Sequence, residues 1–156
     1  MILVAIDPGV NGGIAWRNAG KIYAVKMPPN ELACVEQLVA IFNQVRGNYN
    51  EWVELYLEDP PLFTGRLIPG SAVGKLHRNF GVLLGASYAL GFKVKTVRPQ
   101  DWQAAFDVGK KGKQSTSVWK NVLKSKAEEI YPDGVPVTLW SADALLLLDA
   151  ATKKKV

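Results

Sequence analysis

The first sixteen residues constrain the fold most strongly, because they combine a buried strand, a carboxylate and a turn. Residues 2–6 are five apolar residues in a row, which predicts a buried strand, and Asp7 follows them directly. Residues 8–13 include Pro8 and three glycines, so the chain turns there, and a second strand begins at Ile14. An acid at the end of a hydrophobic strand carries a desolvation cost unless a cation meets it. Asp7 is therefore either a cap of the turn or one member of a cation-binding site.

The periodicity of the remaining chain predicts an α/β fold, with a mixed five-stranded sheet flanked by helices. We expect strands over residues 2–7, 13–18, 21–27, 53–58 and 92–97, the first three as an antiparallel meander. We expect helices over residues 30–46, 72–90, 99–106, 117–130 and 141–151, with Asn30 and Ser141 as candidate N-caps. No internal repeat or linker divides residues 1–156, so we expect one domain with a substantial core.

Two further acids occupy positions comparable to that of the first. Glu58 closes the strand over residues 53–58, just before two prolines that forbid its continuation. Asp143 shares one helical face with Leu146, Leu147 and Ala150, which is the face expected to pack on the sheet. An aspartate on such a face needs a partner, unless it serves only as a first-turn acid that the helix dipole favours.

The three acids together predict a divalent cation site. Carboxylates that converge repel one another, and they stay ionised only if a cation lies between them. Sites built from oxygen ligands alone favour Mg²⁺ or Mn²⁺ over zinc. Two such ions ~4 Å apart can activate a water and stabilise the leaving oxygen when a phosphodiester is cleaved. The net charge of +5 and the pI near 9.3 favour a polyanionic partner, which suits such a site.

Five segments carry a family resemblance that covers nearly the whole chain. They are Ile6-Asp7-Pro8-Gly9, Leu57-Glu58-Asp59, the helix from Asn79-Phe80-Gly81 to Gly91, Val97-Arg98-Pro99-Gln100-Asp101-Trp102 and Ser141-Ala142-Asp143-Ala144-Leu145-Leu146. By these segments the chain resembles RuvC-type Holliday junction resolvases of the RNase H-like superfamily, and it looks closest to their short phage-type members. The resemblance implies an RNase H-like fold, whose strand order agrees with the one expected above.

The resemblance also implies an activity. Asp7, Glu58 and Asp143 would be catalytic carboxylates that bind Mg²⁺, with Mn²⁺ as a substitute. The family implies a homodimer that nicks two opposed strands of a four-way DNA junction. These implications agree with the all-carboxylate site and the basic composition, which were inferred independently of the family.

One position departs from the family pattern. The second acid that the family usually carries one turn before the last aspartate is replaced here by Trp140. Asp149 is a poor substitute, because it lies about 120° around the helix from Asp143 at about 100° per residue. Asp59 follows Glu58 directly and would point to the opposite side of the strand. The departure leaves open how many metal ions the site holds.

Six lysines lie between residues 110 and 126 with no acid among them, and they form the chain's most basic segment. Lys110, Lys111, Lys113 and Lys120 are predicted to contact DNA phosphates, which would make binding strongly salt-dependent. The alternative is an ordinary solvated surface. The resemblance implies that a lysine of this region approaches the scissile phosphate, and we select Lys124 for that catalytic role.

Three residues outside this segment are further candidates for DNA contacts. Lys75 and Arg78 open the long helix and could grip a second strand, whereas the only histidine, His77, is expected on the surface. Phe63 lies in the loop after the second acid, and in the family an aromatic near this place can wedge into the opened junction. Base–aromatic stacking would contribute ~1–3 kcal/mol. The alternative for Phe63 is ordinary loop packing.

Small and aromatic residues suggest two packing features. Gly81, Gly85 and Ala89 form a stripe on the long helix, which is either a dimer contact or a site of close packing within the chain. Trp102 and Phe106 are expected to fill the core.

Taken together, the acid cluster and the resemblance to the family imply a Mg²⁺-dependent crossover junction endodeoxyribonuclease that acts as a homodimer. The alternatives are a branched-DNA-binding protein without cleavage activity and an RNase H-like nuclease on another substrate. No apolar run is long enough for a membrane span, and the first strand lacks the basic flank of a signal peptide. We expect a cytoplasmic protein of a bacterial cell, or of the host cell if a phage encodes it.

Overall fold

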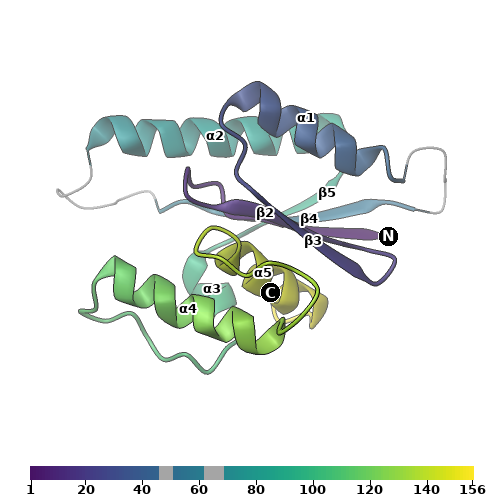
Figure 1. The fold of residues 1–156 in the computed structure, drawn as a ribbon. Helices are drawn as coiled ribbons and strands as arrows, with labels where there is room; N and C mark the ends of the chain where they lie inside the picture. Colours follow the sequence, from purple (N-terminus) through teal and green to yellow (C-terminus); the bar gives the residue numbers. More distant parts are fainter. Residues whose placement is uncertain (46–50, 62–68) are drawn as a thin grey trace.

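A computed structural model describes residues 1–45, 51–61 and 69–156 (Figure 1). Its centre is a five-stranded sheet with the order β3-β2-β1-β4-β5. The strands are β1 (Ile2–Ile6), β2 (Gly13–Asn18), β3 (Lys21–Lys26), β4 (Val53–Glu58) and β5 (Lys93–Val97). β1, β2 and β3 pair antiparallel, whereas β4 pairs parallel with both β1 and β5. The predicted α/β class with a mixed sheet is therefore confirmed.

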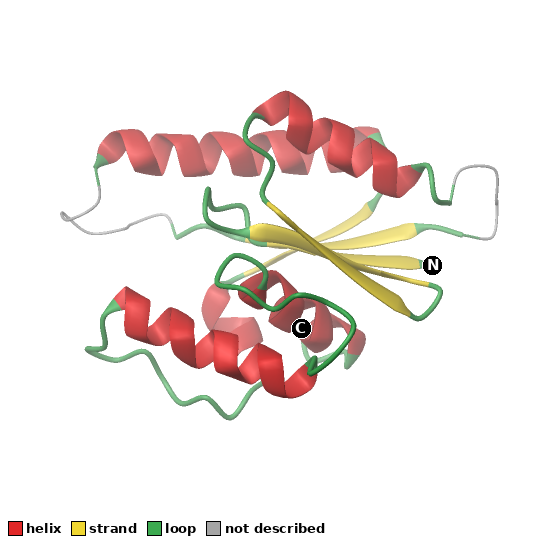
Figure 2. Ribbon diagram, viewed as in Figure 1, coloured by secondary structure: helices red, strands yellow, loops and turns green. Residues whose placement is uncertain are grey.

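Helices cover both faces of the sheet (Figure 2). α1 (Glu31–Phe42) and α2 (Gly70–Ala89) pack on one face, and α3 (Pro99–Gln103), α4 (Thr116–Ile130) and α5 (Ala142–Thr152) lie on the other (Figure 1). Side chains alternate along each strand, so the sheet contributes to two separate hydrophobic cores. None of the helices in the described part of the chain is long and apolar enough to cross a membrane.

The caps and ends of the helices differ in detail from the sequence predictions. Asn30 caps α1 as expected, accepting a hydrogen bond of 2.9 Å from the Ala33 N–H, but α1 ends four residues early, at Phe42. Ser141 precedes α5 as expected, yet its hydroxyl makes no cap bond to that helix. It instead accepts from the Thr138 N–H and so fixes the preceding turn.

Helix α5 is buried on every side, which differs from the single buried face predicted for it. All residues from 142 to 151 are buried, because α5 packs on β1 and β2 and is covered in turn by α3 and α4. A helix with apolar residues on every side is expected in the interior of a protein. An acid in its first turn is therefore held inside the protein rather than at its rim.

Candidate active site

Asp7 is fixed at the point where the buried strand β1 ends. The Gly9 N–H donates to Asp7 Oδ1 at 3.1 Å, and the Asp7 N–H donates to the Gly13 carbonyl at 3.0 Å. Gly12 lies directly against the carboxylate, since a Cβ added there would stand 2.6 Å from Asp7 Cγ. The turn of residues 8–13 thus holds the acid in one place, and only glycine fits beneath it.

A second element supports this turn from the opposite side. The side-chain amide of Asn79, in the middle of α2, donates to the Pro8 carbonyl at 2.7 Å. Sequence reasoning did not identify this role, although Asn79 opens one of the segments that carry the family resemblance. Its polarity on a helix face that otherwise packs on the sheet was the available signal.

Glu58 ends β4, the strand that pairs parallel with β1, so its carboxylate emerges at the same edge of the sheet as Asp7. The Trp102 indole N–H donates to Glu58 Oε2 at 2.7 Å. Burial raises the pKa of Glu58 well above its ordinary value, and the nearby carboxylates of Asp7 and Asp143 raise it further. The strand pairing and the effect of Asp7 and Asp143 on Glu58 together place the three acids close to one another.

Asp143 reaches the same region from the first turn of α5. It is buried, and that burial is the main reason why its pKa is raised. Its Oδ1 atom is buried without a hydrogen-bond partner among the described residues. A carboxylate oxygen in this position is ready to accept a ligand.

Lys120 of α4 supplies the positive charge at this cluster. Its ammonium pairs with Asp143 Oδ2 and lies 3.6 Å from Asp7 Oδ2. Burial acts to lower the pKa of Lys120, but the carboxylates of Asp143 and Asp7 raise it overall. The four charged groups come from β1, β4, α4 and α5, so only the folded chain brings them together.

In this structure the Lys120 ammonium contacts two acids of the cluster, and the catalytic role that the sequence suggested for Lys124 stays a prediction. Lys124 forms an ion pair with Glu128 on its own helix. It lies one helical turn, about 6 Å, further along α4 and away from the acids. The spacing of four residues puts both lysines on one face, so the sequence could not show which turn of α4 meets the acids.

The cluster suits a divalent metal ion in its chemistry. All three acids offer carboxylate oxygens, Asp143 Oδ1 lacks a partner, and the Lys120 ammonium already stands as a cation between two of them. Within the described residues, no three acidic, histidine or cysteine side chains surround one point closely enough to hold an ion.

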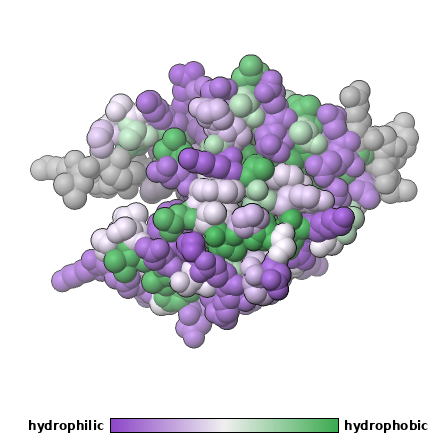
Figure 3. All heavy atoms as spheres, viewed as in Figure 1, coloured by the Kyte–Doolittle hydropathy of each residue, from purple (hydrophilic) through white to green (hydrophobic). Residues whose placement is uncertain are grey.

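The site lies where the two layers of the molecule separate. The turn after β1 and the start of α4 point toward the same side in Figure 1. Figure 3, seen from the same direction, shows many hydrophilic residues on the surface of both layers.

The architecture of this chain is similar to that of proteins of known structure. RuvC from Thermus thermophilus in complex with a Holliday junction substrate matches with a TM-score of 0.59 and 19% identity, over 99% of this chain and 95% of that one. A second Thermus thermophilus RuvC structure gives 0.55 and 20%, over 99% and 96%. The chain has the RuvC fold. No protein-family model and no curated protein matches the sequence.

The other lysines and the arginine predicted to contact DNA lie on the surface. Lys75, Lys110, Lys111 and Lys113 are exposed. Arg78 is also exposed, and its Nε pairs with Glu31 Oε1 at 2.8 Å. Their contacts with DNA stay predictions. Phe63 lies outside the described residues.

Asp149 and Asp59, which were considered above and judged poor substitutes for a fourth acid, make other contacts. Asp149 is buried further along α5, and its Oδ2 lies 2.8 Å from the Lys153 ammonium. Asp59 stands beside β5, where its N–H donates to the Val97 carbonyl. Trp140 precedes α5 and packs on Gly13, where an added Cβ would stand 3.1 Å from its ring. Three acids therefore converge among the described residues.

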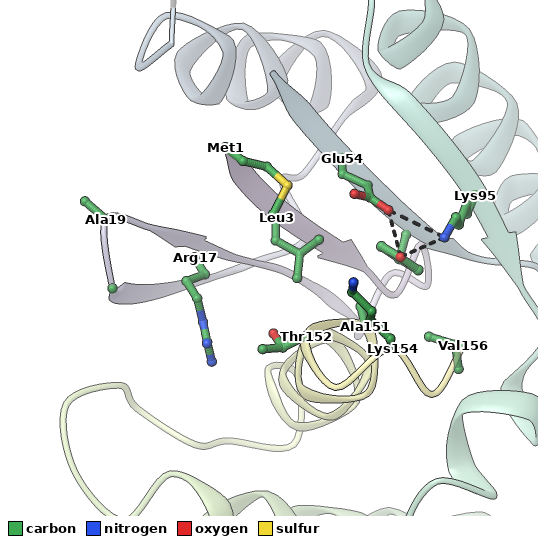
Figure 4. Close-up of a pocket in the computed structure, with 12 residues that line it drawn as sticks. Met1, Leu3, Arg17, Ala19, Glu54, Lys95, Ala151, Thr152, Lys154 and Val156 are labelled. Atoms are coloured by element: carbon green, nitrogen blue, oxygen red, sulfur yellow. Dashed lines mark hydrogen bonds and ion pairs between the residues drawn. The ribbon is translucent and has the colours of Figure 1, made fainter. Parts of the chain in front are cut away.

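A separate cavity of about 700 Å³ lies near the start of β1 (Figure 4). Arg17, Glu54, Tyr56 and Lys95 are among its lining residues, and the Lys95 ammonium donates to the Tyr56 hydroxyl at 3.0 Å. None of the clustered acids lines it. β1 separates this cavity from the acid cluster, so the cavity takes no part in the chemistry of the three acids.

Proposed function

We propose that this protein is a Mg²⁺-dependent, structure-selective endodeoxyribonuclease that resolves four-way DNA junctions by paired nicks. The observation that carries the proposal is the convergence of Asp7, Glu58, Asp143 and Lys120 at the carboxyl ends of β1 and β4. The match to RuvC bound to a Holliday junction substrate supports the choice of substrate. Mn²⁺ is expected to replace Mg²⁺, because the ligands are all carboxylate oxygens.

The chain's own residues would bind and orient the scissile phosphate. A divalent ion held by Asp7, Glu58 and Asp143 would supply Lewis-acid activation of water and stabilisation of the leaving oxygen. Lys120 can turn from the carboxylates toward the phosphate, since its side chain is 32% exposed. Its charge would then stabilise the additional negative charge of the transition state. The products would be a 5′-phosphate and a 3′-hydroxyl.

A homodimer follows from the proposed reaction. Each chain contributes one cluster of acids, and two opposed strands must be nicked, so two copies are needed for one junction. The net charge of +5 favours binding to the phosphates that surround the crossover. The exposed basic residues of α2 and of the loop before α4 are the proposed contacts.

The proposal is tested by comparing substrates under one set of conditions. The purified protein is incubated with Mg²⁺ and a labelled four-way junction, a flap, a linear duplex or an RNA–DNA hybrid of matched sequence. We expect paired nicks in the junction at a rate at least about tenfold above the others. Equal cleavage of all DNA substrates, or preferential cleavage of the hybrid, would instead identify an RNase H-like nuclease of another specificity.

Branched-DNA binding without cleavage is the second candidate function. Trp140 favours it, since this residue packs on Gly13 at the place where the family usually carries a fourth acid. Both functions predict tight junction binding, but only the first predicts products with Mg²⁺. Junction binding without nicks in Mg²⁺ or Mn²⁺ would identify the second function.

A further inference from the structure

The indole of Trp102 has an environment unlike that of an ordinary core residue. Its side chain is fully buried among apolar residues beneath the sheet, yet its N–H donates to the Glu58 carboxylate at 2.7 Å. Trp16 provides a comparison within the same protein, because its indole N–H is buried without a partner among the described residues. The bond to Glu58 is thus not a requirement for burying a tryptophan in this fold.

The segment around Trp102 is built to keep the indole in place. Pro99 begins α3, and the Arg98 guanidinium forms two hydrogen bonds to the Asp101 carboxylate across the first turn, of 2.9 and 3.0 Å. The ring of Phe106 packs edge-on against Trp102, with ring centroids 6.5 Å apart. Residues 97–102, one of the segments that carry the family resemblance, thus have a physical role, which is to hold the Trp102 indole beside the Glu58 carboxylate.

We propose that Trp102 is a positioning residue, which orients the Glu58 carboxylate for the divalent ion. The inference rests on the proposed function, because it assumes that Glu58 is a metal ligand. The indole N–H engages Oε2 and so restricts the rotation of the Glu58 carboxylate. Groups that hydrogen-bond to a metal-binding carboxylate fix its rotamer, and their loss commonly weakens metal binding about 10–100-fold.

The matched variants are Trp102→Phe and Trp16→Phe. Both replace a buried indole by a smaller ring, but only the first removes a hydrogen bond to a carboxylate. Binding of Mn²⁺ to the DNA-free protein is measured by titration calorimetry. We expect about a tenfold or greater loss of affinity in Trp102→Phe and less than a twofold change in Trp16→Phe. Junction affinity in EDTA is expected to stay within twofold of the wild type in both.

A second measurement leaves Trp102 unchanged, so it does not depend on the folding of the Phe variant. The side-chain indole N–H signals of ¹⁵N-labelled protein are recorded for the wild type and for Glu58→Gln, with and without Mg²⁺. We expect one indole signal to move both on Mg²⁺ addition and in Glu58→Gln, while the Trp16 signal stays in place. Indole signals that respond to neither change would overturn the inference.

The outcomes separate this inference from the proposed function. If the wild type binds Mn²⁺ and Trp102→Phe binds it equally well, the positioning role is wrong and the proposed nuclease is unaffected. If the wild type binds Mn²⁺ and Trp102→Phe binds it weakly but neither protein cleaves DNA, the positioning role holds and the nuclease activity is wrong. A wild type that binds no divalent ion would overturn both.

Discussion

At the scale of single residues, Lys120 is the balancing charge of the candidate site. Three carboxylates share a region where burial already raises the pKa of Glu58 and of Asp143. Without a cation, the repulsion between these acids would oppose folding. The Lys120 ammonium, placed between Asp7 and Asp143, offsets this repulsion in the metal-free protein. In the proposed reaction, a divalent ion would take over that part.

Replacing Lys120 by Met is therefore expected to destabilise the metal-free protein. We predict a loss of about 1–3 kcal/mol in the free energy of unfolding, below the range for a fully buried pair because the lysine is partly exposed. Lys124→Met is the matched control, since the acid that Lys124 pairs with among the described residues is the surface residue Glu128, and it should change stability by less than about 0.5 kcal/mol. Urea unfolding in EDTA measures both. Equal effects of the two substitutions would contradict the placement of Lys120.

The raised pKa of Glu58 predicts how stability depends on pH. An acid with a higher pKa in the folded chain adds stability below its unfolded pKa, and that stability is lost as pH rises through the folded value. In EDTA the wild type should therefore lose stability above the ordinary glutamate pKa of 4.5. Glu58→Gln should lose less, and should be about 1–2 kcal/mol more stable near pH 7.

Thermal unfolding across the pH range checks this prediction, with the exposed Glu36→Gln on α1 as the control for loss of one surface charge. Addition of Mg²⁺ should raise the Tm of the wild type more than that of Glu58→Gln, because a bound ion stabilises only the state that holds it. A pH profile that is unchanged in Glu58→Gln would show that Glu58 is not held near the other acids.

At the scale of elements, the turn between β1 and β2 shapes the site as much as its acids do. Gly12 has no room for a side chain, because an added Cβ would stand 2.3 Å from the Asp7 carbonyl oxygen. We predict that Gly12→Ala loses about 1–3 kcal/mol of stability through overpacking and binds Mn²⁺ about tenfold or more weakly. Gly74→Ala in α2 is the control, since its Cβ meets open space and a helix gains up to about 1 kcal/mol from alanine. If Gly12→Ala kept both the stability and the Mn²⁺ affinity of the wild type, the described turn would be contradicted.

The sequence predicted most of the elements and the three acids, but not all of the site. Asp7 and Glu58 end strands, so their positions follow from the chain's own periodicity and from the parallel pairing of β1 with β4. Lys120 and Trp102 lie on helices whose contact with the sheet edge depends on packing angle and turn. Periodicity gives the face of a helix but not which turn along it meets a given strand. The hydrogen bond from Trp102 to Glu58 was for that reason not predicted.

At the scale of the whole molecule, the strand order and the two helical layers agree with the fold expected from the sequence. The central position of α5 was the main difference, since one face was expected to pack and every face is buried. Its four consecutive leucines indicated burial on every side. A helix that only covers a sheet needs one apolar stripe, whereas four apolar residues in a row point in all directions around the helix. The open space beside Gly81 and Gly85 excludes close packing within the described chain as the reason for that stripe.

The glycine stripe of α2 therefore stays the predicted dimer contact. We predict that the wild type sediments as a dimer and that Gly85→Leu shifts it to monomer, because a bulky side chain would separate two helices that approach at glycine. Ser125→Leu, at an exposed position of α4, is the control and should stay dimeric. Sedimentation velocity at several protein concentrations makes the comparison. A dimer that is unaffected by Gly85→Leu would require another interface, and a monomeric wild type would contradict the homodimer.

We propose that Asp7, Glu58 and Asp143 form a metal-dependent nuclease centre for branched DNA. The most direct measurement of this is cleavage of an end-labelled four-way junction by the wild type and by Asp7→Asn, each with Mg²⁺ or EDTA. We predict paired, symmetric nicks by the wild type with Mg²⁺, no nicks in EDTA or by Asp7→Asn, and junction binding by both proteins. Nicks that persist in Asp7→Asn, or tight junction binding by the wild type without nicks in Mg²⁺ or Mn²⁺, would contradict it.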